Sequence, residues 1–377
     1  SHLEGFVVAT RSIDGVARLV ISTSFDERLP FVQPSEFGYD EESALDRNKE
    51  IIAESDVQDW LPRWFDEAGD GSFGEIEPIL PCEDVAAPRD FAGLGITWIA
   101  SVDTLADATP VGSAGIVSTG DTVYASTDNL YIATQNWDWR WGGPVPMPVD
   151  AAVEPTIDQP ATVGSDAVAE PEPESDPDPG PPPTLIHQFE LGAGTDAAYV
   201  ASGEVEGRLL NQFAMSEHNG DLRVATTTDD WGFGQQQDST VFVLRPNGDE
   251  LEQISSIGGL GKGEQIYAVR FIGDVGYVVT FRRIDPLYVL DLSDPTAPEL
   301  DGELKIPGYS AYLHPVGDGL LLGVGQDATD EGRATGTQLS LFDVSDPTDP
   351  QRISTLPIGG QSEVEWDHKA FLFWEPD

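Results

Sequence analysis

The stretch that decides the fold occurs twice in the second half of the chain. Leu287-Tyr-Val-Leu-Asp-Leu-Ser-Asp-Pro-Thr-Ala-Pro298 returns as Leu339-Ser-Leu-Phe-Asp-Val-Ser-Asp-Pro-Thr-Asp-Pro350. Each copy is an apolar run followed by a turn, in which Asp caps the turn and Pro fixes φ. Weaker copies are Thr240–Gly248 and Trp98–Asp103. Spacings of about 46 to 52 residues are close to the period of a four-stranded propeller blade.

One period divides into four strands. In residues 265–306 they are expected at 266–271, 276–281, 287–292 and 299–306, with turn residues between them. The same division applies to residues 309–358 and 209–257. A further unit is interrupted by a linker, and its strands are expected at 115–118, 130–134, 185–191 and 197–205.

Apolar runs at both ends, Phe6–Arg11 and Ala370–Trp374, are interpreted as parts of two further blades. The sequence therefore predicts one all-β domain over residues 1–377, a β-propeller of four complete four-stranded blades and two partial ones. We expect it to be a fragment of a larger ring, because a domain boundary rarely falls inside a strand.

Two segments break the repeat. Residues 24–90 are predicted to be a helical and irregular insertion, because Ala44–Glu54 is rich in helix formers with apolar residues at helical spacing. It is expected to pack against the ring. Residues 144–183 hold twelve Pro and nine acidic residues without a base, so they are predicted to be a disordered acidic linker. This linker is interpreted as a tolerated loop insertion, the alternative being a spacer or cation-attracting arm.

Charge limits the partners. The chain has 67 acidic and 19 basic residues, a net charge of −48. Such a surface repels nucleic acid and anionic membranes, so neither is an expected partner. No apolar stretch reaches the roughly 18 residues that a membrane span needs. Cys82 is the single cysteine, which excludes an internal disulfide and a cysteine zinc cluster, and it is expected to be a buried thiol.

Three long collinear runs carry a family resemblance: Ile266–Arg282, Asp285–Pro295 and Gly302–Gly308. They resemble the secreted bacterial and archaeal proteins with a C-terminal β-propeller distantly related to WD40 repeats. Shorter matching runs are Leu209–Phe213, Leu222–Thr226, Asp59–Pro62 and Asp367–Phe373. The resemblance implies export to the cell envelope or the extracellular space, and further blades beyond this segment. It brings no established reaction and no catalytic residues.

Few residues suggest a site. Asp327, Asp330 and Glu331 place three carboxylates within five residues, a candidate cation site, with Ca²⁺ the single candidate cofactor ion. The Ser-Asp-Pro turns offer one carboxylate each and are interpreted as turn caps. His218, His314 and His368 belong to or follow inner strands, where they either converge on a metal or form separate hydrogen bonds.

Aromatic side chains supply the candidate ligand-binding residues. Trp137, Trp139 and Trp141 form a dense cluster beside the acidic linker. Such rings either stack on sugars or cover a blade edge. Tyr309, Tyr312 and His314 of one inner strand complete the candidate set.

The function expected from these observations is a monomeric extracellular binding or scaffold module for a protein, glycan or polymer. The alternative is a metal-dependent or hydrolytic enzyme with its site at the channel mouth. Gly258–Gly263 lacks the order of a phosphate-binding loop, and a strand follows it. No Gly-x-Ser-x-Gly sequence is present, so serine hydrolase chemistry has no support.

Overall fold

The computed structural model describes residues 1–25, 28–34, 39–106, 109–135, 183–228, 237–281, 285–329 and 333–374. These residues form five four-stranded antiparallel units, which we call blades 1 to 5. Blade 1 contains β2 (Phe6–Ile13), β3 (Val16–Ser24), β7 (Gly95–Asp103) and β8 (Val111–Ile116), and blade 2 contains β9 (Thr122–Ala125), β10 (Asn129–Gln135), β11 (Thr184–Leu191) and β12 (Ala197–Val205).

The other three blades follow in chain order. Blade 3 contains β14 (Met215–His218), β15 (Asp221–Thr228), β16 (Asp238–Asn247) and β17 (Glu250–Leu260), blade 4 contains β18 (Gln265–Ile272), β19 (Val275–Phe281), β20 (Asp285–Asp291) and β21 (Glu299–Ile306), and blade 5 contains β22 (Tyr309–Gly317), β23 (Leu320–Ala328), β24 (Ala334–Asp343) and β25 (Gln351–Pro357). Short β13 (Arg208–Leu209) also pairs with β15, and β6 (Val85–Ala86) pairs in parallel with β8.

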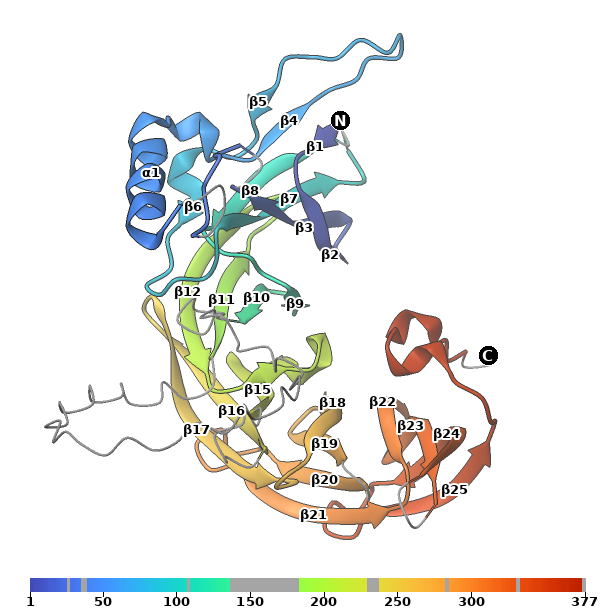
Figure 1. Cartoon of the computed structure of the whole chain (residues 1–377). Helices are drawn as coiled ribbons and strands as arrows, with labels where there is room; N and C mark the ends of the chain where they lie inside the picture. Colours follow the sequence, from blue (N-terminus) through green and yellow to red (C-terminus); the bar gives the residue numbers. More distant parts are fainter. Residues whose placement is uncertain are drawn as a thin grey trace, which may run out of the picture.

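The blades follow one another along an open arc (Figure 1). The first strand of each blade lies on the inside of the arc and the fourth on the outside, and blades 1 and 5 form its two ends. This arrangement confirms the predicted propeller fold. Blades 2 and 3 are also joined by a parallel bridge between their outer strands, at Ser202 and Glu250.

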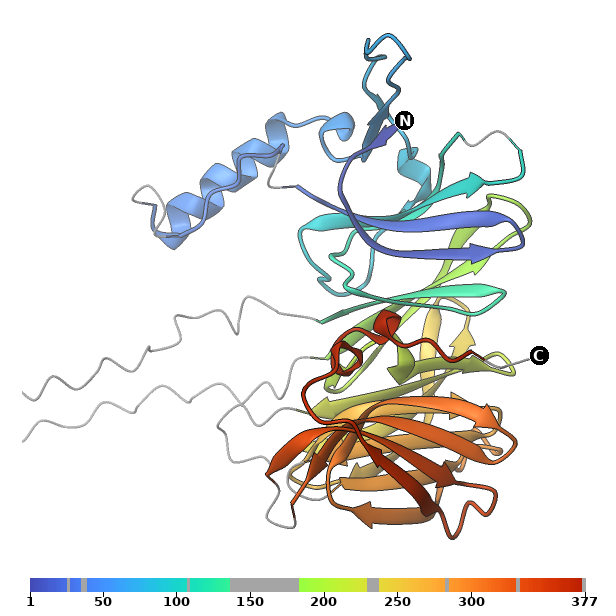
Figure 2. The same ribbon diagram turned by 90° about the vertical axis from the view of Figure 1, so that its right-hand side faces the viewer.

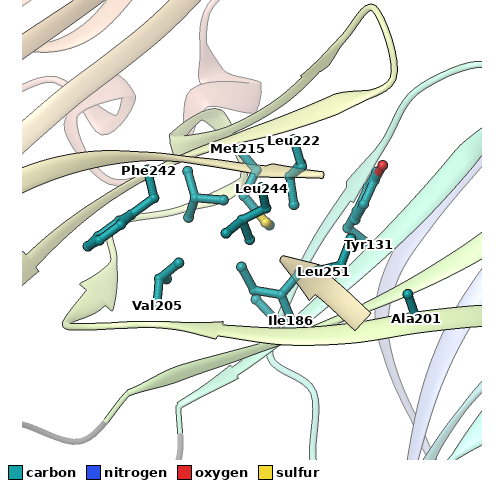
Figure 3. Packing of buried hydrophobic residues seen from close by; sticks show 11 residues of the cluster. Tyr131, Ile186, Ala201, Val205, Met215, Leu222, Phe242, Leu244 and Leu251 are labelled. Atoms are coloured by element: carbon teal, nitrogen blue, oxygen red, sulfur yellow. The ribbon is translucent and has the colours of Figure 1, made fainter. Parts of the chain in front are cut away.

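The core lies between the blades rather than inside any one of them. Four apolar clusters fill the four junctions between neighbouring blades. Figure 3 shows the cluster between blades 2 and 3, which contains Ile186 of blade 2 and Leu222, Leu244 and Leu251 of blade 3. Strands buried on both faces therefore need apolar residues at successive positions, as in Leu287–Leu290.

The first blade corrects the predicted count of four complete and two partial blades. Phe6–Arg11 was expected to begin a partial blade, but β7 and β8 complete it after the long insertion. The insertion separates β3 from β7 in sequence and hides the repeat. Residues 115–118, expected to open the next blade, instead include the end of β8, and the inner strand of blade 2 is β9.

The predicted strand at Ala370–Trp374 is also wrong. This segment begins at the end of the short 3-10 helix η7 (His368–Ala370) and continues without a strand to Trp374. The side chains of Phe371 and Phe373 pack against Tyr312 and His314 of the inner strand of blade 5. Apolar content alone therefore misled the prediction here.

The connection between β3 and β7 contains helix α1 (Glu41–Glu54), which extends away from the blades (Figure 2). Asp40 caps the helix by accepting a hydrogen bond from the Ser43 amide. Ile51 packs with Phe25 and Leu80 in a fifth apolar cluster beside blade 1. The remaining short elements here are β1 (His2–Leu3), β4 (Arg63–Phe65) and β5 (Glu77–Pro78), which form one sheet, and the 3-10 helices η2 (Val57–Asp59) and η3 (Cys82–Asp84). Cys82, expected to be buried, is exposed.

The hairpin of β10 and β11 keeps its register across a long connection. Its pairs run without a shift from Asn129 opposite Glu190 to Gln135 opposite Thr184. The predicted acidic linker, residues 144–183, lies in this connection and, apart from its last residue, outside the described residues. Among the described helices, none is long and apolar enough to cross a membrane.

Candidate functional site

A cavity of about 330 Å³ opens on the inside of the arc. Elements of four blades surround it: β2, β9, β14 with the preceding 3-10 helix η5 (Gln212–Ala214), and β18. We call it the axis cavity. Its lining residues are Arg11, Tyr124, Ala125, Gln212, Phe213, Met215, Ser216, Arg270 and Phe271.

Arg11 of β2 ties three blades together at this cavity. Its Nη2 atom donates a 2.7 Å hydrogen bond to the carbonyl oxygen of Val123 in β9 and another hydrogen bond to Oε1 of Gln212. Gln212 in turn contacts His368, with 2.9 Å between their Nε2 atoms. Burial lowers the pKa of Arg11 from its usual value.

Arg270 of β18 lies between two aromatic rings. Its guanidinium carbon is 4.5 Å from the ring centroid of Phe213 and 5.5 Å from that of Tyr312, which are cation–π distances. Its Nε donates to the Leu313 carbonyl oxygen at 3.1 Å, and its Nη2 donates to the Tyr312 hydroxyl at 3.2 Å. The side chain is therefore held in one orientation beside the cavity.

Arg223 of β15 hydrogen-bonds to Ser216 of the cavity lining and itself lines a neighbouring pocket with His218 and Asp274. It is 4% exposed, and burial lowers its pKa to about 10. Its Nη2 donates to the Ser216 hydroxyl at 2.9 Å and its Nη1 to the Gly273 carbonyl oxygen at 2.6 Å. The guanidinium also lies 5.0 Å from the centroid of the Phe271 ring, while its buried Nε has no hydrogen-bond partner.

Glu217 is the acidic residue that follows Ser216 of the cavity lining in β14. Its carboxylate accepts hydrogen bonds from Ser126 at 2.8 Å, Asn129 at 3.1 Å and the Tyr131 hydroxyl at 3.1 Å. Burial first, and then the charge of Glu217, raises the pKa of Tyr131 well above its usual value. Three donors therefore satisfy this carboxylate at the junction of blades 2 and 3.

The C-terminal segment, residues 362–374, lies inside the arc (Figures 1 and 2). It contains 3-10 helices η6 (Glu363–Glu365) and η7. The His368 ring packs edge-on against Phe213 with centroids 4.9 Å apart. Phe371 contacts both Tyr312 and His314, each at 5.1 Å.

The structure brings together only part of the predicted ligand-binding set. Tyr312 and His314 lie close to each other, 3.3 Å apart between the hydroxyl oxygen and Nδ1, beside Arg270. Tyr309, from the start of the same strand, instead packs with Tyr267 and Phe281 and donates to Glu365 at 3.3 Å. Trp137, Trp139 and Trp141 lie outside the described residues.

The candidate cation site is described only at Asp327, whose carboxylate accepts a 2.9 Å hydrogen bond from Thr335. Asp330 and Glu331 lie outside the described residues. The Nε2 atom of His218 lies 2.9 Å from the Asp274 carboxylate. His314 and His368 instead contact the aromatic rings of Phe371 and Phe213. In the part of the chain that the structure describes, no three His, Cys, Asp or Glu side chains are grouped as metal ligands.

The Ser-Asp-Pro turns are capped by their own carboxylates. Asp294 accepts from the amide and the hydroxyl of Thr296 at 2.9 and 2.6 Å, and Asp346 does the same with Thr348 at 3.0 and 2.7 Å. The hydroxyl bond, and then the amide bond, lowers the pKa of Asp294. These contacts are the turn capping that the sequence predicts.

A second cavity, of about 250 Å³, lies between the outer strands of blades 2 and 3. It is lined in part by His187 and Ser202, whose Nδ1 and Oγ atoms are 2.5 Å apart. Burial lowers the pKa of His187 to about 4, and its Nε2 has no partner. Among the described residues, no carboxylate is hydrogen-bonded to this imidazole.

The arginines, Gln212 and Phe213 were missed by sequence reasoning. One signal was available: Arg11 and Arg270 are rare basic residues at the ends of inner-strand runs in a strongly acidic chain. Their convergence was not visible, because Arg11 and Gln212 are 201 positions apart.

The fold and this inner face define a β-propeller with a cavity at its axis. Residues 1–377 match the family described as "Beta propeller domain", and the chain belongs to this family. The relationship to WD40 repeats stays a prediction.

Two archaeal proteins are similar in sequence. The protein MJ1554 of Methanocaldococcus jannaschii, described as uncharacterized, is 45% identical over 185 residues, which cover 48% of this chain and 28% of that one. An uncharacterized protein of Archaeoglobus fulgidus is 48% identical over 169 residues, covering 45% and 25%. The matched region is about a quarter of each relative's length.

Among solved structures, a mutant of the Synechocystis apocarotenoid oxygenase is similar with a TM-score of 0.37 and 12% identity, covering 70% of this chain and 56% of that one.

Proposed function

We propose that the chain is the binding module of a secreted or cell-envelope protein and takes its extracellular protein or glycan partner on the inside of the arc. The observation that carries the proposal is the axis cavity, to which elements of four blades contribute. Ligand sites are commonly concave, and a few convergent polar side chains fix the orientation of the ligand in them.

The lining favours binding over catalysis. It combines aromatic rings, amides and guanidinium groups, which recognise ligands without reacting with them. Ser216 carries the aliphatic hydroxyl of the lining, and this hydroxyl accepts a hydrogen bond from Arg223. Among the described residues, no hydrogen bond from this hydroxyl to a general base activates it as a nucleophile.

The test is a screen of the full chain against a glycan array and against purified cell-envelope polymers. Phe213→Ala removes the ring that contacts Arg270 and His368 inside the arc. Phe73→Ala is the matched control, because it removes an exposed phenylalanine in the insertion. We expect the screen to find a ligand that the unmodified chain binds. Its affinity should fall at least about tenfold in Phe213→Ala and stay unchanged in Phe73→Ala. If the ligand binds Phe213→Ala and Phe73→Ala with equal affinity, its binding site is not the axis cavity.

A further inference from the structure

We propose that the axis cavity binds an oxyanion, a carboxylate or phosphate group carried by the ligand. This inference deepens the proposed function and rests on the same cavity. It is carried by two arginines that line the cavity, Arg11 and Arg270, and by Arg223, which donates a hydrogen bond to Ser216 of the lining. The hydrogen-bond partners of all three are neutral. We call them the axis arginines.

The distribution of ion pairs is the first step. Acidic residues outnumber basic ones by 67 to 19, so an arginine in this chain has many available counterions. Arginines on the surface use them, as in the pairs Arg47–Glu50, Arg63–Asp59, Arg89–Asp249 and Arg245–Asp221. Across the described residues, no ion pair involves an axis arginine. Among the described residues, no carboxylate therefore forms an ion pair with the positive charge of these three arginines.

The neutral partners hold the axis arginines in place without using all their donors. A guanidinium has five N–H donors. Arg270 uses its Nε and Nη2 on Leu313 and Tyr312, which leaves Nη1 for a ligand. Arg11 uses its Nη1 and Nη2 on backbone oxygens and Gln212, which leaves its Nε. Two guanidinium groups that both line one cavity can bind the oxygens of a planar or tetrahedral anion.

Two carboxylates close to these arginines already have partners of their own. Glu217 accepts from Ser126, Asn129 and Tyr131, and Asp274 pairs with His218. Asp274 raises the pKa of Arg223 only as a minor influence against burial. These acids therefore leave room for an additional negative charge in the cavity.

The positive potential is felt by two histidines on the same side of the arc. Burial first, and then the charge of Arg270, lowers the pKa of His314. Burial also lowers the pKa of His368; the Asp367 carboxylate opposes this shift, and the charges of Lys369, Arg11 and Arg270 add to it in that order. The positive charge of an arginine that disfavours protonation of a nearby histidine also attracts an anion. Binding of an anion would offset the free-energy cost of burying that unpaired charge.

The direct test titrates the full chain with sodium glucuronate and with inorganic phosphate at constant ionic strength, using glucose as the neutral match for glucuronate. We expect glucuronate or phosphate to bind and to raise the Tm by about 2 °C or more, and glucose to do neither. The two anions distinguish a carboxylate ligand from a phosphate ligand. Equal Tm values in all three solutes would overturn the inference.

Substitutions of single arginines test whether the anion binds at the axis cavity. Arg270→Gln and Arg11→Gln are expected to weaken anion binding at least about tenfold, because each removes a charge-assisted hydrogen bond. Arg47→Gln removes the same charge from the exposed face of α1 and should leave binding unchanged. A loss of affinity in Arg47→Gln equal to that of the axis variants would show nonspecific attraction and overturn the site.

Ser216→Asp keeps the test decisive even if an arginine variant fails to fold. It places a carboxylate beside Arg223 at the cavity wall. We expect this variant to have a higher Tm without ligand and to lose the response to glucuronate and phosphate. A lower Tm together with intact anion binding would overturn the inference.

The experiments distinguish a failure of the proposed binding function from a failure of the proposed oxyanion site. If anions do not bind but a neutral glycan binds in a Phe213-dependent way, the binding module stands and its ligand chemistry is wrong. If anions bind and no envelope polymer or glycan does, the oxyanion site stands and the module function is wrong.

Discussion

Arg11 in β2 donates a 2.7 Å hydrogen bond to the backbone oxygen of Val123 in β9, so the inner strands of blades 1 and 2 are joined by a side chain instead of a sheet ladder. Among the described strands, the backbone ladder of blade 1 ends at β2 and that of blade 2 ends at β9, so no backbone pairing joins these two strands. One long side chain thus supplies the directional contact on the inside of the arc, which apolar packing cannot supply.

The first prediction concerns this contact. Arg11→Met keeps most of the apolar stem of the side chain and removes the hydrogen bonds to Val123 and Gln212. We expect the free energy of unfolding to fall by about 1–3 kcal/mol, because two partly buried acceptors lose their donor. Urea unfolding measures the change. Arg47→Met, on the exposed face of α1, should change it much less, and equal losses would show that the junction contact carries no particular stability.

A second prediction concerns the clusters between blades. Leu244 is fully buried between blades 2 and 3, as Figure 3 shows. Leu244→Ala should cost about 2–5 kcal/mol of unfolding free energy, because it deletes buried carbons and leaves a cavity.

Ile353→Ala on the outer strand of blade 5, where the side chain is 54% exposed, should stay within about 0.5 kcal/mol of the unmodified chain. Similar costs for Leu244→Ala and Ile353→Ala, measured by denaturant titration, would contradict the placement of the core between blades.

A third prediction uses pH. The pKa of His187 is lowered to about 4 by burial, below the value of about 6.5 for an unfolded chain. Between these values the unfolded chain binds a proton that the folded chain does not, so stability is complete above the unfolded pKa and falls as the pH drops.

When the pH is lowered from 7 to 5, we expect the contribution of His187 to lower the free energy of unfolding by about 2 kcal/mol. His187→Gln should lack this part of the pH dependence, and subtracting its unfolding curve from that of the unmodified chain isolates it. Parallel pH profiles of the two proteins would show that His187 is not buried in its neutral form.

A fourth prediction concerns the repeated turn. Asp294→Ala removes the acceptor for the amide and hydroxyl of Thr296, whereas Asp294→Asn keeps an oxygen in the same position. We expect Asp294→Ala to lower the Tm more than Asp294→Asn at pH 7. Because the pKa of Asp294 is lowered in the folded chain, the charged carboxylate stabilises above its unfolded pKa and loses this effect as the pH falls through its folded value.

The difference in Tm between the unmodified chain and Asp294→Asn should therefore shrink towards pH 3. Thermal unfolding followed by circular dichroism gives the comparison. An alanine variant that is as stable as the asparagine variant would mean that the turn does not depend on its cap.

Much of the sheet structure was predictable, because the alternation of strands and turns is local. Leu287–Leu292 and its copy at 339–344 fall on the third strands of blades 4 and 5, and Trp98–Asp103 falls on the third strand of blade 1. Blade 1 was harder to recognise, since its second and third strands are separated by the insertion. The apolar run Ala370–Trp374 was assigned to a strand because hydrophobicity does not distinguish a strand from an irregular segment that packs on a surface.

The candidate site was less predictable than the fold. Tyr312 and His314 were found because they lie on an inner strand of a clear repeat. The axis arginines depend on which residues of distant strands face one another, and strand facing changes with every one-residue shift of register. β-bulges shift the register inside β18, at Ile266–Ala268, and inside β22, at Ser310–Tyr312. Such shifts leave no clear mark in a single sequence.

The in-register hairpin of β10 and β11 has a consequence for engineering. Its seven residue pairs form although residues 136–183 separate the two strands. The entropy cost of closing a connection grows only with the logarithm of its length, so blade 2 accepts a long insert at little cost. The connection between β10 and β11 is therefore a suitable insertion site. A fluorescent protein or an affinity tag can replace residues 136–183 there, as an alternative to a fusion at either terminus.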